Sequence, residues 1–452
     1  MARPCKSGGG QGLAPQHAGM TAHEHPAATR AHFRPDRRRL LCCGAAALGF
    51  FTSLAPAPAQ ASPWTSPCPD TPPRPALDSA LQDLLARCWD GLDPARVWDV
   101  HTHLLGSGDA GSGCRLSPVM DQWWHPMEVV RKRVIMDAAC ARPAGTGPAA
   151  STDRAYVQRL RQLAADFPPG ARWLLYAFDE ALDAQGRPRP DWTTFHTPDV
   201  YAQGVAAAHP ERFGWVASIH PYRPDALERL ARARAGGAVA IKWLPSSMAI
   251  DLRDTRLRPF YEQLAASRLP LIVHCGEEHA VPGAGREDLG NPLLLREPLR
   301  HGVRVIAAHC ASLGQALDLD RSRPRRRPAF ELFARLMDEA DGRQRLLGDV
   351  SAVFQFNREP EVWRTLLSRQ DWHERLLHGS DYPLPAVRPL HRLGRLVAAG
   401  LLERAKVPHL ERLRDANPLL FDFALKRSVR WEGQVLSPRV FASAHHFGAA
   451  VS

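Results

Sequence analysis

The feature that most constrains the fold is a series of short apolar runs, each of which ends near a polar residue. Eight such runs recur along the chain, at 97–103, 172–179, 213–221, 238–243, 271–274, 303–309, 346–351 and 376–381. A short run that is apolar almost throughout is typical of a strand buried on both faces of a parallel sheet. Apolar residues at helical spacing separate several of the runs, at 224–234, 257–267 and 330–339. Alternating strands and helices predict parallel β/α units.

Eight such units predict a (β/α)₈ TIM barrel of the α/β class over residues 97–424. We expect a long insertion after the first strand, because 106–170 far exceeds an ordinary connection. The remaining chain is assigned to an N-terminal extension at 62–96 and a C-terminal extension at 425–452. In this fold the carboxyl ends of all strands open on one face. The polar residues expected to meet there include His101, His103, His274, His309 and Asp381.

The first run ends in two histidines at alternating positions, His101 and His103. On a strand, residues i and i+2 point to the same side, so both imidazoles are expected to aim at one point. Two neutral imidazole nitrogens suit a borderline-soft divalent cation such as zinc. Histidines at strand ends are also common as structural residues. The metal-site hypothesis therefore depends on the later strands that end in the same chemistry.

Residues 1–61 form a separate segment with the features of an export signal. The triplet Arg37–Arg38–Arg39 precedes an apolar stretch at 40–54, and the small residues of Ala59-Gln60-Ala61 follow it. The apolar stretch is too short to span a bilayer, so no stable membrane span is expected. The arginines predict a twin-arginine-type signal and a periplasmic location, with a cytoplasmic protein as the alternative.

Six cysteines follow this segment. Cys275 and Cys310 each come directly after a strand-end histidine, so they are expected to point away from the site into barrel packing. The other four precede the second run, and in an oxidising compartment some of them can pair. The sequence leaves the pairing open among Cys68, Cys88, Cys114 and Cys140.

The formal net charge of +11 does not indicate a nucleic-acid partner. The basic cluster at 323–327 lacks the interleaved aromatic residues of a nucleic-acid surface and is predicted to be a solvated loop. No phosphate loop, nucleophile elbow or dinucleotide fingerprint occurs where a strand-to-helix turn requires one. The expected partner is a small-molecule substrate, and the oligomeric state stays open.

The strand-end motifs resemble those of the amidohydrolase superfamily. They read WDVHTH at 98–103, IVHCGE at 272–277, VIAAH at 305–309 and GSDYP at 379–383. The closest branch is the amidohydrolase-related group that includes aminocarboxymuconate-semialdehyde decarboxylase-like enzymes. Its closing Asn-x-x-x-Phe element resembles Asn417-Pro418-Leu419-Leu420-Phe421. The resemblance implies one divalent ion, usually zinc, held by His101, His103, His274 and Asp381, with His309 as a catalytic residue beside it.

Taken by themselves, these residue types are suited to hydrolysis by a metal-activated water. Three imidazoles and one carboxylate leave a zinc ion open to water or substrate, and such an ion brings the pKa of bound water to about 7. Asp381 would take the proton of that water and pass it to a leaving group, while His309 stabilises charge on a substrate oxygen. The sequence therefore predicts a metal-dependent hydrolase of an amide, ester or lactone bond. The alternatives are a non-oxidative decarboxylase of a conjugated or aromatic carboxylic acid on the same scaffold, and a metal-binding protein without turnover.

Lys242 ends the fourth run, where some members of the superfamily carry a carboxylated lysine that bridges two metals. An unmodified lysine is favoured, which would bind a substrate carboxylate or form an ion pair with Glu277. Lys242 and Glu277 are therefore candidates for a second metal or for substrate binding. Glu278 is a candidate for shaping the pocket, and Asp349 and His220 are weaker candidates of the same kind.

Overall fold

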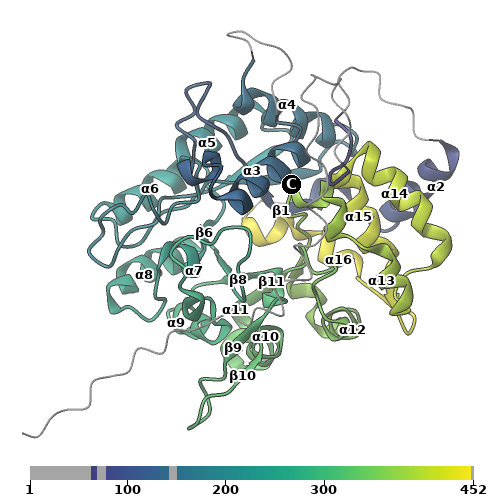
Figure 1. Ribbon diagram of the computed structural model, residues 1–452. Helices are drawn as coiled ribbons and strands as arrows, with labels where there is room; N and C mark the ends of the chain where they lie inside the picture. Colours follow the sequence, from purple (N-terminus) through teal and green to yellow (C-terminus); the bar gives the residue numbers. More distant parts are fainter. Residues whose placement is uncertain (1–62, 69–77, 142–149, 449–452) are drawn as a thin grey trace, which may run out of the picture. The chain divides into compact units, whose positions relative to one another are not determined.

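Eight parallel strands follow one another around a closed sheet in the order in which they occur in the chain. The computed structural model describes residues 63–68, 78–141 and 150–448 (Figure 1). The expected export signal at 1–61 lies outside the described residues. Within them, no helix is both long and apolar enough to cross a membrane.

Each strand lies within one of the eight apolar runs. Two sheets hold them, one of β1, β3 and β5 and one of β6, β7, β8, β11 and β12, and every pairing between these neighbours is parallel. Parallel bridges between Ala217 and Ile241 and between Thr102 and Tyr382 join the sheets on both sides. The predicted barrel is thereby confirmed. The strands span Trp98–His103 (β1), Arg172–Tyr176 (β3), Phe213–Val216 (β5), Ile241–Trp243 (β6), Leu271–His274 (β7), Val305–Ala308 (β8), Leu346–Asp349 (β11) and Leu376–Leu377 (β12).

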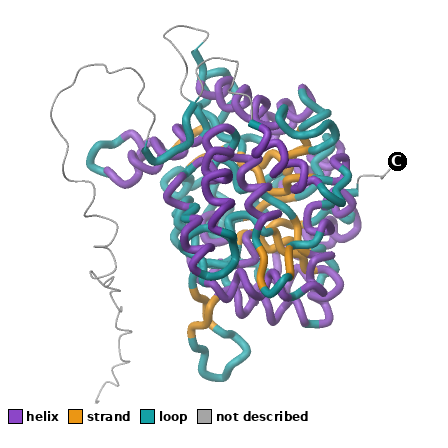
Figure 2. The backbone as a smooth tube through the Cα atoms, turned by 90° about the vertical axis from the view of Figure 1, so that its right-hand side faces the viewer, coloured by secondary structure: helices purple, strands orange, loops and turns teal. Residues whose placement is uncertain are grey.

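Helices follow the strands in sequence and lie around the sheet (Figures 1 and 2). Three of them, α6 (Ala226–Ala235), α8 (Arg258–Ser267) and α10 (Ala329–Asp338), begin within two residues of the helices expected from the sequence. The others that pack around the barrel are α4 (Thr152–Ala164), α5 (Asp199–Ala208), α9 (Arg296–Arg300), α12 (Pro360–Ser368), α13 (Leu393–Ala398), α14 (Val407–Ala416) and α15 (Pro418–Ser428).

The barrel interior is a packed apolar layer with one side chain or two from each strand. Its members are Trp98, Val100, Leu174, Tyr176, Val216, Ala240, Ile272, Ile306, Leu347 and Leu377, together with Ala444 and Phe447 from the end of the chain. The C-terminal extension thus adds to the floor of the barrel. Phe447 stacks on Trp98 with ring centroids 6.1 Å apart, and Ser443 Oγ donates to the carbonyl of Trp98 at 2.6 Å.

This packing predicts that the Phe447→Ala substitution lowers the free energy of unfolding by about 3 kcal/mol, because it removes a buried ring and leaves a cavity. Urea unfolding of the purified protein measures the change. Val435→Ala is the matched control, since Val435 lies on the exposed short strand β14 (Gln434–Val435) of the same extension. Equal stability of both variants would contradict a role of the extension in the barrel floor.

The long insertion after β1 lies along the rim of the barrel. It contains α3 (Pro126–Ala138), α4 and the short strand β2 (Arg115–Leu116), which pairs with β4 (Phe195–His196) from the next connection. Tyr156 on α4 donates its hydroxyl to the carbonyl of His103 at 2.7 Å. The insertion is therefore anchored to the end of the first strand.

The basic cluster at 323–327 lies at the end of the loop and on the second strand of a hairpin formed by β9 (Gln315–Leu317) and β10 (Arg326–Pro328). Figure 2 shows this hairpin projecting from the body. All five residues of the cluster are exposed, which confirms the predicted solvated loop.

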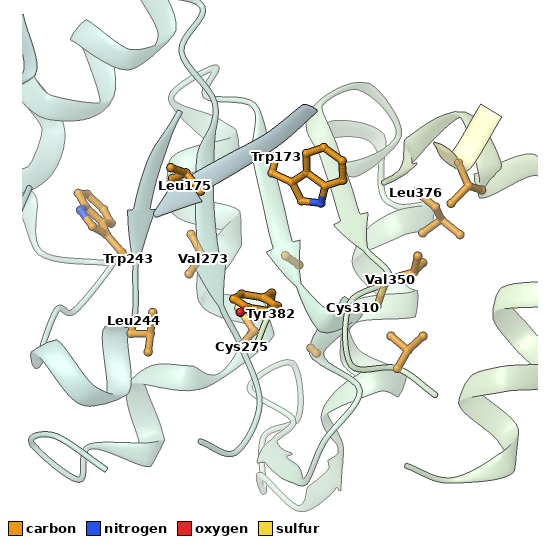
Figure 3. Close-up of a cluster of buried hydrophobic side chains, with 14 of the residues drawn as sticks. Trp173, Leu175, Trp243, Leu244, Val273, Cys275, Cys310, Val350, Leu376 and Tyr382 are labelled. Atoms are coloured by element: carbon orange, nitrogen blue, oxygen red, sulfur yellow. The ribbon is translucent and has the colours of Figure 1, made fainter. Parts of the chain in front are cut away.

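The cysteines divide as their positions in the chain suggest. Cys68 and Cys140 form a disulfide, whereas Cys88 and Cys114 are free and buried. Cys275 and Cys310 belong to the apolar layer on the outer face of the barrel sheet, which also contains Trp173, Trp243 and Val273 (Figure 3). Their predicted direction, away from the site, is confirmed.

Candidate metal centre

Strand β1 turns both of its histidines into the barrel by means of a β-bulge. Its register against β3 shifts between Asp99 and Thr102. Val100 belongs to the inner apolar layer, and His101 also faces inward, with its ring centroid 4.7 Å from that of Tyr176. Bulges of this kind re-aim side chains beside functional sites. Without the bulge, two adjacent residues of a strand would face opposite sides.

The carboxylate of Asp381 lies against both histidines of β1. Its Oδ1 is 3.0 Å from His103 Nε2 and 3.5 Å from His101 Nε2. Its backbone N–H donates to the carbonyl of His101 at 2.8 Å, and its φ of 60° is left-handed. Aspartate tolerates this conformation better than most residues. The residue is only 4% exposed.

Asp349 holds His101 from the opposite side. Its Oδ2 is 3.0 Å from His101 Nδ1, and its Oδ1 accepts from the backbone N–H groups of His309 at 3.1 Å and Ser351 at 3.0 Å. A carboxylate on Nδ1 fixes the proton on that nitrogen and directs Nε2 toward the site. Asp349 is therefore a positioning residue, a role for which the sequence marked it only weakly.

His309 lies between His101 and His274, with ring centroids 4.7 Å and 5.2 Å away. Its Nδ1 is 2.8 Å from Ser351 Oγ. His101, His309 and Asp381 each offer a ligand atom within 4.8 Å of the others. His274 Nε2 lies 3.2 Å from the Oε2 atom of Glu278 but has no hydrogen-bond partner. The strand-end residues named from the sequence thus gather in one cluster.

Lys242 lies inside the barrel near this cluster, whereas Glu277 does not. Lys242 Nζ is 5.2 Å from the ring centroid of Tyr176. Glu277 lies near the surface, 3.4 Å from His279 and 3.7 Å from Arg326. The expected ion pair between Lys242 and Glu277 is therefore wrong.

The reason is the turn at Gly276, which comes directly after β7. Its φ is 90°, and a Cβ there would lie 2.5 Å from the carbonyl oxygen of Leu313. The strand alternation stops at this glycine. Glu278, and not Glu277, then reaches back to His274.

The groups of the cluster are in the protonation state that binds a cation. Burial lowers the pKa of His101 to about 4 and that of His309 well below its usual value. Burial opposes ionisation of Asp381, but the imidazoles of His309, His103 and His101 outweigh it and hold the pKa of that carboxyl well below its usual range. Burial thus favours the neutral, metal-binding form of His101 and His309, and metal binding also needs the carboxylate of Asp381 ionised.

The donor set fits a divalent cation. Nitrogen atoms of His101 and His309 and a carboxylate oxygen of Asp381 converge on one point, and the buried Nε2 of His274 makes no hydrogen bond within the described chain, although Glu278 Oε2 lies 3.2 Å away. A buried polar atom without a partner is unfavourable unless something binds it. His101, His103 and Asp381, with His274 or His309, are the residues that would hold the ion.

Comparison with known proteins identifies the family of this chain. The family model described as Amidohydrolase matches residues 98–407. The chain belongs to the amidohydrolase family. Proteins of this family bind divalent metals, and membership supports an enzyme of the amidohydrolase type. No curated protein matches the amidohydrolase chain by sequence.

Several solved structures resemble this amidohydrolase at low identity. An uncharacterized TIM-barrel protein, Bb4693 from Bordetella bronchiseptica, is 14% identical, with a TM-score of 0.42, over 67% of this chain and 99% of that one. 5-Carboxyvanillate decarboxylase LigW from Sphingomonas paucimobilis is 14% identical, with a TM-score of 0.41, over 71% and 96%. 4-Oxalomesaconate hydratase LigJ from Rhodopseudomonas palustris is 15% identical, with a TM-score of 0.36, over 73% and 98%.

One buried cation near the cluster was not signalled by the sequence. Arg358 follows the loop after β11 and is 5% exposed. Its Nε donates to Ser312 Oγ at 3.0 Å, and its Nη1 donates to Asn357 Oδ1 at 2.6 Å. It belongs to no motif and ends no apolar run, so only the fold brings it to the site.

The role of Asp349 leads to a prediction. Asp349→Asn should weaken metal affinity about 10–100-fold, because the amide no longer holds the proton on His101 Nδ1 as a carboxylate does. Metal titration followed by calorimetry measures the affinity. Asp318→Asn is the control, because Asp318 is a buried aspartate paired with Arg335 outside the site. Equal metal affinity in the Asp349 variant and the wild type would contradict the positioning role.

Proposed function

We propose that the protein is a metal-dependent hydrolase that acts on an amide, ester or lactone bond of a small molecule. One observation carries the proposal: the carboxylate of Asp381 lies buried at the carboxyl end of the barrel, with Oδ1 within 3.5 Å of the imidazole nitrogens of both His101 and His103. Because the pKa of Asp381 lies well below its usual value, its carboxylate is ionised at neutral pH and can accept a proton.

The ligand set proposed from the sequence is His101, His103, His274 and Asp381. Its content of imidazole favours zinc among the divalent ions. When bound, such an ion supplies Lewis acidity, which polarises a substrate oxygen and lowers the pKa of water to about 7.

The side chains divide the remaining work. Asp381 accepts the proton of the attacking water and returns it to the leaving group, and the contact of its Oδ1 with His103 Nε2 holds the carboxylate in place. His309 lies beside Asp381 with its Nδ1 engaged by Ser351, so its Nε2 is the atom placed to interact with a substrate oxygen on which charge develops. Asp349 and Ser351 keep the rings of His101 and His309 in place.

The test begins with the metal content of the purified protein. Chromogenic esters, lactones and anilides are then screened for turnover, with Asp381→Asn as the inactive control. Hydrolysis that requires the metal and Asp381 supports the proposal. Release of carbon dioxide from conjugated or aromatic acids, without hydrolysis, would assign the decarboxylase alternative. Bound metal with no turnover of either kind would indicate a metal-binding protein.

A further inference from the structure

We infer that the site takes a substrate bearing a carboxylate, which Lys242 and Arg358 bind. This inference rests on the proposed function and narrows its substrate class. It is carried by two buried cations beside the cluster, neither of which has a carboxylate within ion-pair distance among the described residues.

Lys242 is 1% exposed, and its Nζ has no hydrogen-bond partner in the part of the chain that the structure describes. Lys426, on α15, shows what a structural buried lysine looks like in the same protein. It is equally buried, yet its Nζ lies 2.5 Å from Asp422 Oδ2 and 2.6 Å from the carbonyl of Gly379. A buried ammonium without a counter-ion is strongly unfavourable. Lys242 Nζ faces the ring of Tyr176 at 5.2 Å but makes no ion pair or hydrogen bond within the described chain.

Arg358 offers the same contrast. Its hydrogen bonds go to the hydroxyl of Ser312 and to the side-chain amide oxygens of Asn357 and Gln355, which are neutral. Arg223, which lies on the rim away from the cluster, bonds to the carboxylates of Asp179 and Glu180 instead. A guanidinium held by neutral groups keeps its charge available for an anion from outside, and a carboxylate matches its donor fork.

The two cations border one site. Burial lowers the pKa of both cations; the nearby carboxylates of Asp349, Asp381 and Glu278 oppose this for Lys242, and those of Asp381 and Glu278 oppose it for Arg358. Lys242 lies on strand β6. Arg358 lies in the loop after β11 and is hydrogen-bonded to Ser312, three residues after His309. We therefore expect a carboxylate bound by these cations to lie in the same site as Asp381.

The test measures binding of benzoate to the metal-loaded protein, with neutral benzamide as the matched probe. Lys242→Met and Arg358→Met should each weaken benzoate binding by roughly tenfold or more, since each removes a charge-assisted contact. Arg223→Met is the control and should leave benzoate binding unchanged. The titrations are repeated after chelator treatment, so that binding to the metal alone is distinguished from binding to the side chains. Acetate and succinate extend the probe set.

Stability supplies a second readout. Lys242→Met should raise the melting temperature by about 2–4 °C, because it removes an unpaired buried charge, whereas Lys426→Met should lower it. A residue with a purely structural role would give the opposite result at position 242. Lys242→Gln repeats the binding test if the methionine variant folds poorly.

The outcomes separate this inference from the proposed function. Carboxylate binding that is equal in all variants, or absent from the wild type for every probe, overturns the inference even if neutral esters are hydrolysed. Binding that depends on Lys242 and Arg358 supports the inference even if no bond is hydrolysed, in which case only the proposed function fails.

Discussion

Replacing Asp381 by asparagine should lower kcat/KM by about 10²–10⁴-fold, the range expected when a general acid–base residue is lost. The amide has nearly the same shape but cannot take a proton from water. The pKa of Asp381 lies well below its usual range, so the wild-type carboxylate is already ionised throughout the neutral range. Steady-state kinetics on whichever ester, lactone or amide proves to be hydrolysed measures the loss.

The control for this substitution is Asp199→Asn. Asp199 accepts a hydrogen bond from the backbone N–H of Ser218 at 2.9 Å, outside the cluster, and asparagine can still accept that bond. Its activity should match the wild type. If Asp381→Asn keeps full activity and full metal content, Asp381 is not the proton acceptor.

The barrel could be predicted from the sequence because its strands are buried on both faces. Each strand must then be apolar almost throughout, and the first polar residue marks the carboxyl end. This is why His101, His274 and Asp381 could be placed together across almost the whole chain. The fold alone forces residues at such ends to meet.

The details that the sequence did not reveal depend on backbone geometry. The bulge in β1 and the turn at Gly276 change which side chain faces inward, and neither alters the apolar pattern. The second of these placed Glu278, and not Glu277, against His274. Arg358 and its neutral partners lie on a loop, where no periodicity constrains direction. Contacts of this kind come from the packing of connections and not from the strands that they join.

The second large effect concerns the two histidines on β7 and after β8. His274→Ala should abolish stoichiometric metal binding, whereas His309→Ala should retain the metal and lose turnover. The expectation follows from the proposed ligand set, in which His274 holds the ion and His309 does not; His274 Nε2 makes no hydrogen bond within the described chain, although Glu278 Oε2 lies 3.2 Å away. The affinity lost with His274 should exceed the roughly 10–100-fold that follows from loss of an outer hydrogen-bond partner.

Metal analysis after gel filtration and the melting temperature measure this difference together. An ion present at 1,000 times its Kd stabilises the folded state by about 4 kcal/mol, so a variant that cannot bind it should melt like the chelator-treated wild type. The His309 variant should melt like the loaded protein. The reverse pattern would assign His309 to the ion instead, with His101 and Asp381, whose ligand atoms lie within 4.8 Å of its own. His274, which lies 3.2 Å from Glu278, would then be the imidazole that interacts with the substrate oxygen.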